Sequence, residues 1–235
     1  MPDLVAYRFD DNVATVSMDD GKVNVLSPQM LSELNSALDK AEADGATAVV
    51  LAGRDGVFSA GFDLKVLTAG GEPARGMLIG GFELALRILS FPSPTVIACT
   101  GHGLAMGSFL LLSADHRIGA DGPFKIGANE VAIGMVMPLF AVEICRLRLA
   151  NHHFGRAVTT AEIYSPAGAV EAGWLDRAVP PEEVADAAAA KAAELTKLSI
   201  GAYRGTKAAA RAGTFALLRE AIEADDAAYR ALGGL

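Results

Sequence analysis

The sequence has few cysteines and only one tryptophan. The two cysteines among its 235 residues, Cys99 and Cys145, each lie in an apolar segment. We therefore expect two buried thiols in a reducing compartment rather than a disulfide framework. No cluster of Cys and His has the spacing of a metal site, so we expect no bound metal. With aromatic residues at 6%, surfaces for stacking bases are scarce.

Positive charge is also in short supply. Lys and Arg total 20 against 28 Asp and Glu, which gives a net charge of −8. This balance argues against nucleic acid or an anionic membrane as a partner, but it leaves room for a local basic patch that binds a phosphorylated ligand.

A membrane span and a leader are not expected either. Residues 95–114 carry no charged side chain other than His102 and approach spanning length, yet Gly101, Gly103 and Gly107 interrupt them. A strand, a glycine turn and a helix explain this stretch better. The first residues carry several aspartates and no apolar core, unlike a signal peptide. We expect a soluble, cytoplasmic protein.

The apolar residues, 51% of the chain, are patterned for an α/β fold. Over the first 135 residues or so, strands alternate with helices, which favours crossover units, and from Pro138 the pattern is helical. Ser27 before Pro28 is a helix N-cap signal. Residues 53–61 and 70–81 are expected to be loops, the second including a rim of the pocket. The predicted strands are 5–9, 13–16, 48–52, 95–99 and 117–120, and the predicted helices are 28–41, 82–89, one from 107, and 184–195.

Two loops could carry chemistry. Residues 57–64 and 101–107 each follow a strand, contain glycines and lead into a helix. The first N–H groups of a helix have no intrahelical partner, and two of them aimed at one point make an oxyanion hole for a thioester carbonyl. Taken alone, such loops are more often plain turns. Neither fits a dinucleotide or phosphate-loop pattern.

Several segments together resemble the crotonase (enoyl-CoA hydratase/isomerase) superfamily, in the right order over nearly the whole chain. They are Lys22-Val23-Asn24-Val25-Leu26-Ser27, Phe58-Ser59-Ala60-Gly61-Phe62-Asp63-Leu64, Gly101 through Ile118, Gly127-Ala128-Asn129-Glu130-Val131-Ala132-Ile133-Gly134-Met135, and Thr206-Lys207.

The resemblance implies an α/β crotonase-like fold of stacked ββα units with a C-terminal helical trimerisation region. We accordingly divide the chain into a ββα core, 1–190, and a helical region, 191–235. It further implies an acyl-CoA thioester as substrate, with CoA arriving as part of the substrate and no separate cofactor. The expected assembly is a homotrimer or a hexamer.

The resemblance also assigns residues to the site. Glu130 is the expected catalytic carboxylate, and the backbone N–H groups of Phe62 and Met106 are the expected oxyanion donors. The adenine-contacting carbonyl maps near Ala60, and Lys207 is expected to reach the CoA of a neighbouring subunit. The expected substrate- and CoA-binding residues are Lys22, Val23, Ala60, Asp63, Leu64, Lys65, Phe109, Met135 and Lys207.

One departure from the family separates the possible reactions. Hydratases of this superfamily use two glutamates, and the positions that match are Glu130 and Phe109. Hydration needs one group to activate water and one to protonate carbon, and phenylalanine does neither. Moving a double bond from C3–C4 to C2–C3 needs a single base. The sequence therefore favours an enoyl-CoA isomerase in which burial raises the pKa of Glu130.

Other functions stay open at this point. The first alternative is an enoyl-CoA hydratase that works with one glutamate or with an acid placed elsewhere. The same oxyanion hole also suits hydrolysis or decarboxylation of acyl-CoA. From another class comes a non-catalytic acyl-CoA-binding protein. The plainer interpretations make Glu130 a surface or cap carboxylate and Phe109 a core residue.

Overall fold

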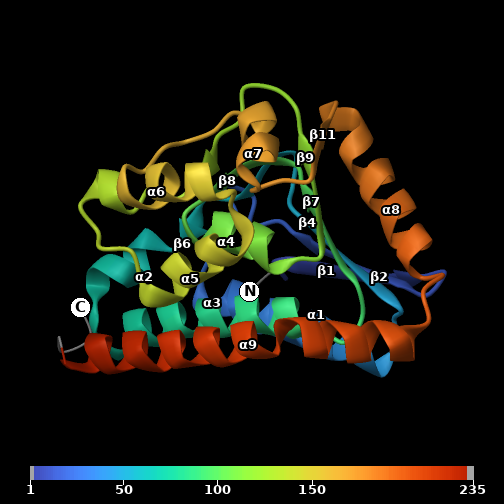
Figure 1. The fold of residues 1–235 in the computed structure, drawn as a ribbon, viewed down its shortest axis with the longest axis horizontal. Helices are drawn as coiled ribbons and strands as arrows, with labels where there is room; N and C mark the ends of the chain where they lie inside the picture. Colours follow the sequence, from blue (N-terminus) through green and yellow to red (C-terminus); the bar gives the residue numbers. More distant parts are fainter. Residues whose placement is uncertain (1–2, 232–235) are drawn as a thin grey trace.

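The computed structural model describes residues 3–231, and a six-stranded sheet forms its centre (Figure 1). All neighbouring strands in this sheet run parallel except the first pair. The strands lie in the order β1 (Val5–Asp10), β2 (Val13–Met18), β4 (Ala48–Ala52), β7 (Thr95–Cys99), β9 (His116–Ala120) and β11 (Arg177–Val179).

Two smaller sheets stand beside it. The order in the first is β10 (Ile126–Gly127), β8 (Gly101–Leu104) and β5 (Gly56–Ser59), and the second pairs β3 (Val25–Leu26) with β6 (Gly61–Phe62). The helices are α1 (Pro28–Ala43), α2 (Leu64–Ala69), α3 (Gly71–Ser90), α4 (Met106–Ser113), α5 (Leu139–Arg148), α6 (Asn151–Thr159), α7 (Pro166–Ala172), α8 (Val184–Leu195) and α9 (Ile200–Ala231), with 3-10 turns at Val131–Ile133 and Pro181–Glu183.

Local signals in the sequence account for the first elements. Asp11 and Asn12 both have positive φ, +46° and +63°, which is the geometry of a tight β-hairpin between antiparallel β1 and β2. Ser27 caps α1, since its Oγ accepts the N–H of Met30 at 3.2 Å and Pro28 is the first helical residue. The strands predicted at 5–9 and 13–16 and the helix predicted from Pro28 are confirmed.

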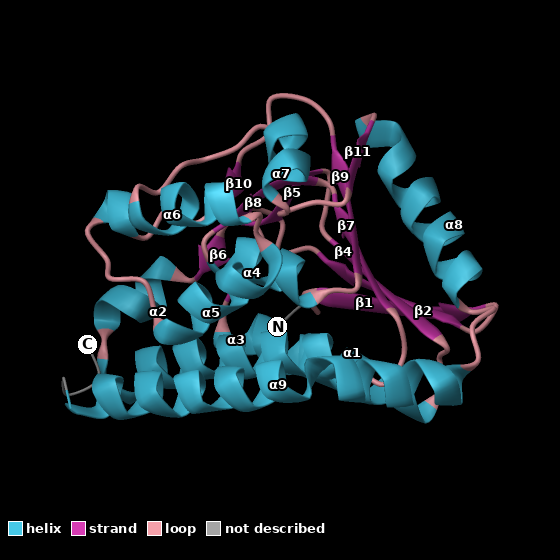
Figure 2. Ribbon diagram, viewed as in Figure 1, coloured by secondary structure: helices cyan, strands magenta, loops and turns pink. Residues whose placement is uncertain are grey.

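Helices cover both faces of the main sheet (Figure 2). Successive side chains of a strand point to opposite faces. Val49 and Leu51 of β4 therefore join the main core with α1, α3 and α4, whereas Ala48 and Val50 pack under α8. This burial on both sides explains why the strand is a continuous apolar run rather than an alternating one.

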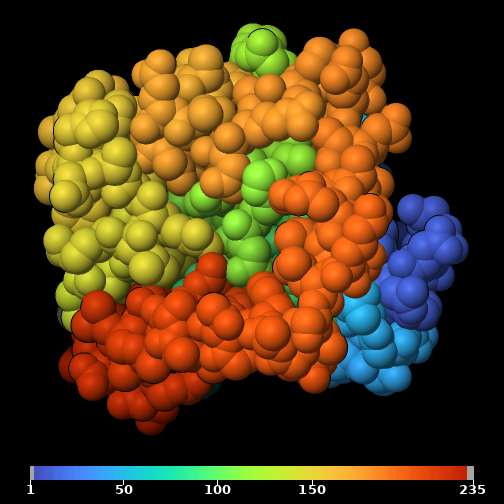
Figure 3. Space-filling view, turned by 45° about the vertical axis from the view of Figure 1, so that its right-hand side comes forward, coloured from blue at the N-terminus to red at the C-terminus, as the bar shows by residue number. Residues whose placement is uncertain are grey.

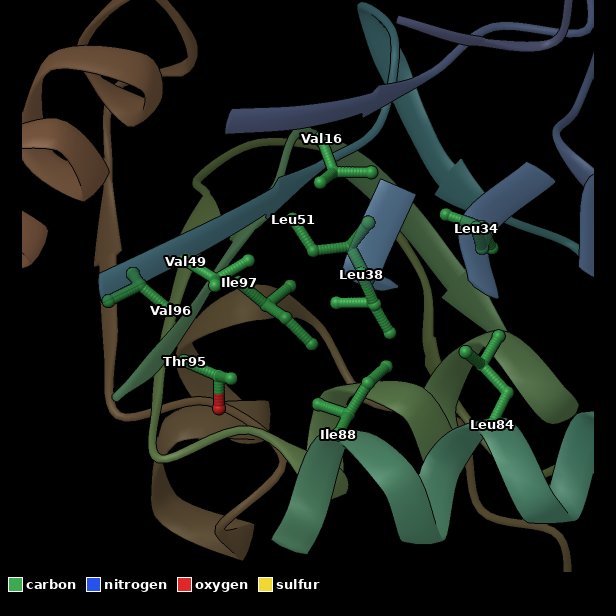
Figure 4. A pocket seen from close by; sticks show the side chains of 10 residues that line it. All are labelled: Val16, Leu34, Leu38, Val49, Leu51, Leu84, Ile88, Thr95, Val96 and Ile97. Carbon is green, nitrogen blue, oxygen red and sulfur yellow. The ribbon is translucent and has the colours of Figure 1, made fainter. Parts of the chain in front are cut away.

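The main core holds a cavity of about 10 Å³ between the sheet and helices α1 and α3 (Figure 4). Its lining is apolar apart from Thr95, with Val16, Leu38 and Ile97 among the side chains that face it. A space of this volume holds about one water-sized probe, and an apolar one stays dry. It is a packing gap and not a ligand site.

The structure differs from the sequence expectation mainly where glycines cluster. The expected loop 70–81 is the first half of α3, which begins at Gly71. Glycine lowers helix propensity, but tertiary packing overrides it here. A Cβ at Gly81 would lie 2.5 Å from the ring of Phe62, so the glycine lets that ring approach the helix. Strands β3, β5, β6, β8, β10 and β11 were also not predicted, because each is short and pairs with a distant segment.

The long helix α9 packs along α3 and α5 (Figures 1 and 3). Figure 3 shows it as an orange-to-red band across the lower edge of that face. The expected division after residue 190 falls inside α8, and the helices separate only at residues 196–199. No helix within residues 3–231 is long and apolar enough to cross a membrane.

A buried charge cluster fastens α9 to the sheet. The Asp115 carboxylate accepts the Tyr203 hydroxyl at 2.7 Å, the Lys207 ammonium at 2.9 Å and the Arg211 guanidinium at 3.0 Å. Burial lowers the pKa of Lys207 to about 8, against the opposing charge of Asp115. Burial acts to raise the pKa of Asp115, but the Lys207 charge and the hydrogen bonds hold it below its usual value.

We expect Asp115→Asn to lower the free energy of unfolding by about 3–5 kcal/mol, because it leaves the Lys207 ammonium buried without its counter-charge. Urea denaturation checks this. The control is Lys191→Gln, which breaks an exposed pair with Glu194 and should cost less than about 0.5 kcal/mol. Equal midpoints for the two variants would contradict the assignment.

Candidate functional site

Two backbone turns meet at the start of α4. A Cβ at Gly107 would lie 2.5 Å from the carbonyl oxygen of Ser59, so only glycine permits this approach. A Cβ at Gly61, whose φ is +97°, would lie 2.8 Å from that of Ala105 and 3.4 Å from the nitrogen of Met106. The backbone nitrogen of Met106 therefore lies close to Gly61, the residue before Phe62.

The backbone N–H of Met106 lacks a partner among the described residues although Met106 is fully buried. Met106 is the first residue of α4, and no acceptor for its N–H is found within residues 3–231. The preceding Ala105 has φ +50° and ψ −128°, an uncommon conformation for a residue with a side chain. A hydrogen bond of 3.1 Å from the Ala105 N–H to Gly127 holds it there, and this geometry sets the direction of the Met106 N–H.

Aromatic packing fixes the second loop. Phe62 pairs with Leu26 in the β3–β6 ladder. Its ring meets Phe82 of α3 edge-on, with 6.1 Å between centroids, and Phe82 stacks on Phe140 of α5 at 5.0 Å. Such pairs add about 0.5–1.5 kcal/mol beyond the area they bury. The side chain of Phe62 thus packs on α3, which in turn packs on α5 through Phe82 and Phe140.

The pairing of β10 with β8 determines where Glu130 lies. Gly127 in β10 pairs with Leu104 in β8, so the chain leaves the sheet next to the Ala105–Met106 turn. The Glu130 carbonyl then accepts the N–H of Met135 at 2.9 Å and closes a turn. The side chain is only 7% exposed, and its Oε2 has no hydrogen-bond partner among the described residues.

Burial raises the pKa of Glu130 to about 7, and the backbone N–H groups of residues 129 and 130 oppose the shift only in part. The Glu130 charge adds to burial in raising the pKa of Cys145 on α5. It also adds to burial and to Asp225 in raising the pKa of Tyr229 on α9. The carboxylate therefore lies where α5 and α9 come together.

No second carboxylate stands at the matching place on α4. That position is Phe109, one turn after Met106 and 1% exposed. No group of three or more metal-ligating side chains occurs in the part of the chain that the structure describes. The arrangement supplies one buried acid–base group and at least one free N–H donor.

The expected CoA contacts at the first loop come together. The Ala60 N–H donates to the Val23 carbonyl at 3.0 Å, and Lys22 and Val23 are both exposed. The Asp20 carboxylate accepts the N–H groups of Lys22, Asn24 and Val25 and so shapes the turn that presents them.

The remaining expected contacts lie in different surroundings. The Asp63 carboxylate caps α2 by accepting the Lys65 N–H at 2.9 Å, which leaves Leu64 and Lys65 exposed. Met135 is half-buried in the turn after Glu130. Lys207 donates to Phe91, Asp115 and Tyr203, so its three N–H groups are all used within the chain. We therefore leave Lys207 out of the proposed site.

Comparisons with known proteins decide the family. The enoyl-CoA hydratase/isomerase family model matches residues 8–233. The chain belongs to the enoyl-CoA hydratase/isomerase family. It is 32% identical over 227 residues to human mitochondrial enoyl-CoA delta isomerase 1, with 94% of this chain and 75% of that protein covered. It is 34% identical over 202 residues to a putative enoyl-CoA hydratase of Thermus thermophilus, with 83% and 79% covered.

The fold of the family is present throughout. An apo structure of an enoyl-CoA isomerase from Mycobacterium tuberculosis is 46% identical, with a TM-score of 0.93 and with 97% of this chain and 99% of that chain covered. The predicted crotonase superfamily and crotonase fold, with a long C-terminal helix, are confirmed. The relatives include proteins named as isomerases and as hydratases, so family membership does not distinguish the two reactions.

Sequence reasoning missed three features of this site. Alanine does not signal positive φ, so nothing marked Ala105. Asn129, whose Oδ1 is buried without a partner among residues 3–231, was quoted only as part of a motif. Asp225 was not noticed, because its role depends on a partner segment 85 residues away. The position of Asn129 next to Glu130 in the sequence is the signal that could have marked Asn129 as part of the site.

Since the pKa of Glu130 is raised on folding, the folded state favours the protonated carboxyl more strongly than the unfolded state does. The resulting stabilisation is fully present below about pH 4.5 and is lost as the pH rises through about 7. We expect the free energy of unfolding of Glu130→Gln, relative to that of the wild type, to rise by about 3 kcal/mol between about pH 4.5 and pH 8. Urea denaturation across this range measures it. The exposed Glu171→Gln is the matched control. A flat curve for Glu130→Gln would contradict the buried state.

Proposed function

We propose that the protein isomerises 3-enoyl-CoA thioesters to 2-enoyl-CoA, with Glu130 as the single base. The observation that carries this proposal is one buried carboxylate, with a pKa of about 7 and an unpartnered oxygen, which follows a strand paired to the segment before α4, where the Met106 N–H has no acceptor in the described chain. A base of this pKa is matched to proton transfer near neutral pH.

In the proposed reaction Glu130 removes a proton from C2 of the substrate. The electrons shift to give a dienolate, whose oxygen accepts hydrogen bonds from the N–H groups of Phe62 and Met106. Glu130 then returns the proton at C4, and the double bond ends at C2–C3. No atom is gained or lost. The N-terminal end of α4 adds favourable partial charge at the dienolate oxygen.

Phe109 has two effects in this scheme. It supplies no second acid–base group, and its apolar ring helps to exclude the water that would add across the double bond. The half-buried Met135 provides an adaptable wall for the acyl chain.

We further propose that Lys22, Val23 and Ala60 bind the CoA nucleotide, with Lys65 nearby on α2. Their support is the hydrogen bond that joins Val23 to Ala60 and the exposure of both lysines. CoA enters as part of the substrate. Assembly as a homotrimer or hexamer and a cytoplasmic location remain predictions.

The second candidate is an enoyl-CoA hydratase, which the similarity to the Thermus thermophilus protein favours. It needs a group other than residue 109 to complete the acid–base pair. Crotonyl-CoA hydration by the wild-type protein distinguishes the two, because the proposed isomerase lacks the second carboxylate.

The test is an isomerisation assay with a 3-enoyl-CoA, followed by absorbance of the conjugated product. We expect wild-type turnover, and a fall of at least about 100-fold for Glu130→Gln, because the amide cannot carry the proton. The control Glu171→Gln changes an exposed glutamate in the same way and should match the wild type.

Three results would contradict the proposal. Isomerisation at the wild-type rate in Glu130→Gln would show that Glu130 is not the base. Hydration faster than isomerisation supports the second candidate. Tight binding of CoA thioesters without turnover indicates an acyl-CoA-binding protein.

A further inference from the structure

The C-terminal helix reaches the candidate site through one carboxylate. Asp225 of α9 accepts the N–H of Leu139 on Oδ1 and the N–H of Phe140 on Oδ2, both at 2.9 Å. These are the first two residues of α5, and the preceding Pro138 offers no side-chain cap. Asp225 thus satisfies helix N–H groups that would otherwise lack partners. It is 7% exposed.

The start of α5 is also the end of the segment that carries Glu130. At its other end this segment is held by the pairing of β10 with β8. Between the two ends, the turn closed by the Met135 N–H and the Glu130 carbonyl orients the side chain. Asp225 is therefore the anchor on the C-terminal side of Glu130.

The contact of Asp225 with α5 also reaches Phe62, the proposed oxyanion donor, through packed aromatic rings. Phe140, whose N–H binds Asp225, is fully buried and stacks on Phe82, which in turn meets the ring of Phe62. A shift of the first turn of α5 is passed to Phe62 through closely packed rings. Both the proposed base and one proposed donor thus depend on where α5 begins.

We propose that Asp225 is a positioning residue, which holds the α5 N-terminus and thereby sets the distance between Glu130 and the Phe62 backbone. This inference rests on the proposed function. It makes the C-terminal helix part of the framework of its own chain's site. The effect is geometric, since Asp225 is not among the groups that shift the pKa of Glu130.

The test compares Asp225→Ala, Asp225→Asn and the matched control Glu223→Gln, an exposed carboxylate two residues away on α9. We expect kcat to fall about 10- to 100-fold for Asp225→Ala, with KM changed by less than about threefold, because small misplacements of reacting groups are costly. Asp225→Asn should be intermediate, since its amide oxygen still accepts one N–H. The apparent pKa of the kcat profile should stay at the wild-type value.

Wild-type kcat in Asp225→Ala would overturn the inference. So would a loss of activity that only follows the folded fraction seen by circular dichroism, or a shifted pKa in the kcat profile. Hydrogen exchange at Leu139 and Phe140 separates this inference from the proposed function, because it needs no turnover. These two amides should exchange faster in Asp225→Ala than in Glu223→Gln, and equal rates overturn the inference even if the wild type proves inactive as an isomerase.

Discussion

The site depends on the close approach of two backbone turns, at Ser59–Phe62 and at Leu104–Gly107. Neither Gly61 nor Gly107 has room for a side chain, and the carbonyl oxygen of Ser59 lies only 2.5 Å from the place of a Cβ at Gly107. This contact brings the start of α4 against β6, so two chain segments more than forty residues apart share one small volume. The N–H of the buried Met106, which follows the positive-φ Ala105, has no acceptor in the described chain.

Around this contact the fold removes water from a single carboxylate. Burial without a neutralising cation raises the pKa of Glu130, which makes it a stronger base when ionised and costs stability at high pH. The surroundings come from α5 and from α9, the last described helix of the chain. Phenylalanine at position 109 keeps the matching place on α4 apolar. These surroundings support the proposed proton transfer within a substrate.

Local patterns were enough to predict the elements that are marked by residue type or by a run of apolar residues. The Asp11–Asn12 turn and the Ser27 cap are read directly from residue type, and β4 from its apolar run. The two loops are recognised by glycines that lead into a helix, whereas Glu130 is assigned through a family resemblance and not through periodicity. What was missed depends on distant packing. Gly81 inside α3 lets the Phe62 ring approach the helix, and two of the three partners of Lys207, Phe91 and Asp115, lie about 90 residues or more away in the chain.

The most direct test of the account is a crystal structure with a non-reactive enoyl-CoA thioester analogue. The account predicts that the thioester oxygen lies about 2.7–3.1 Å from the nitrogens of both Phe62 and Met106. Glu130 should be the only carboxylate facing C2 and C4. A thioester oxygen bound elsewhere, or a second carboxylate facing Glu130 across the double bond, would contradict it.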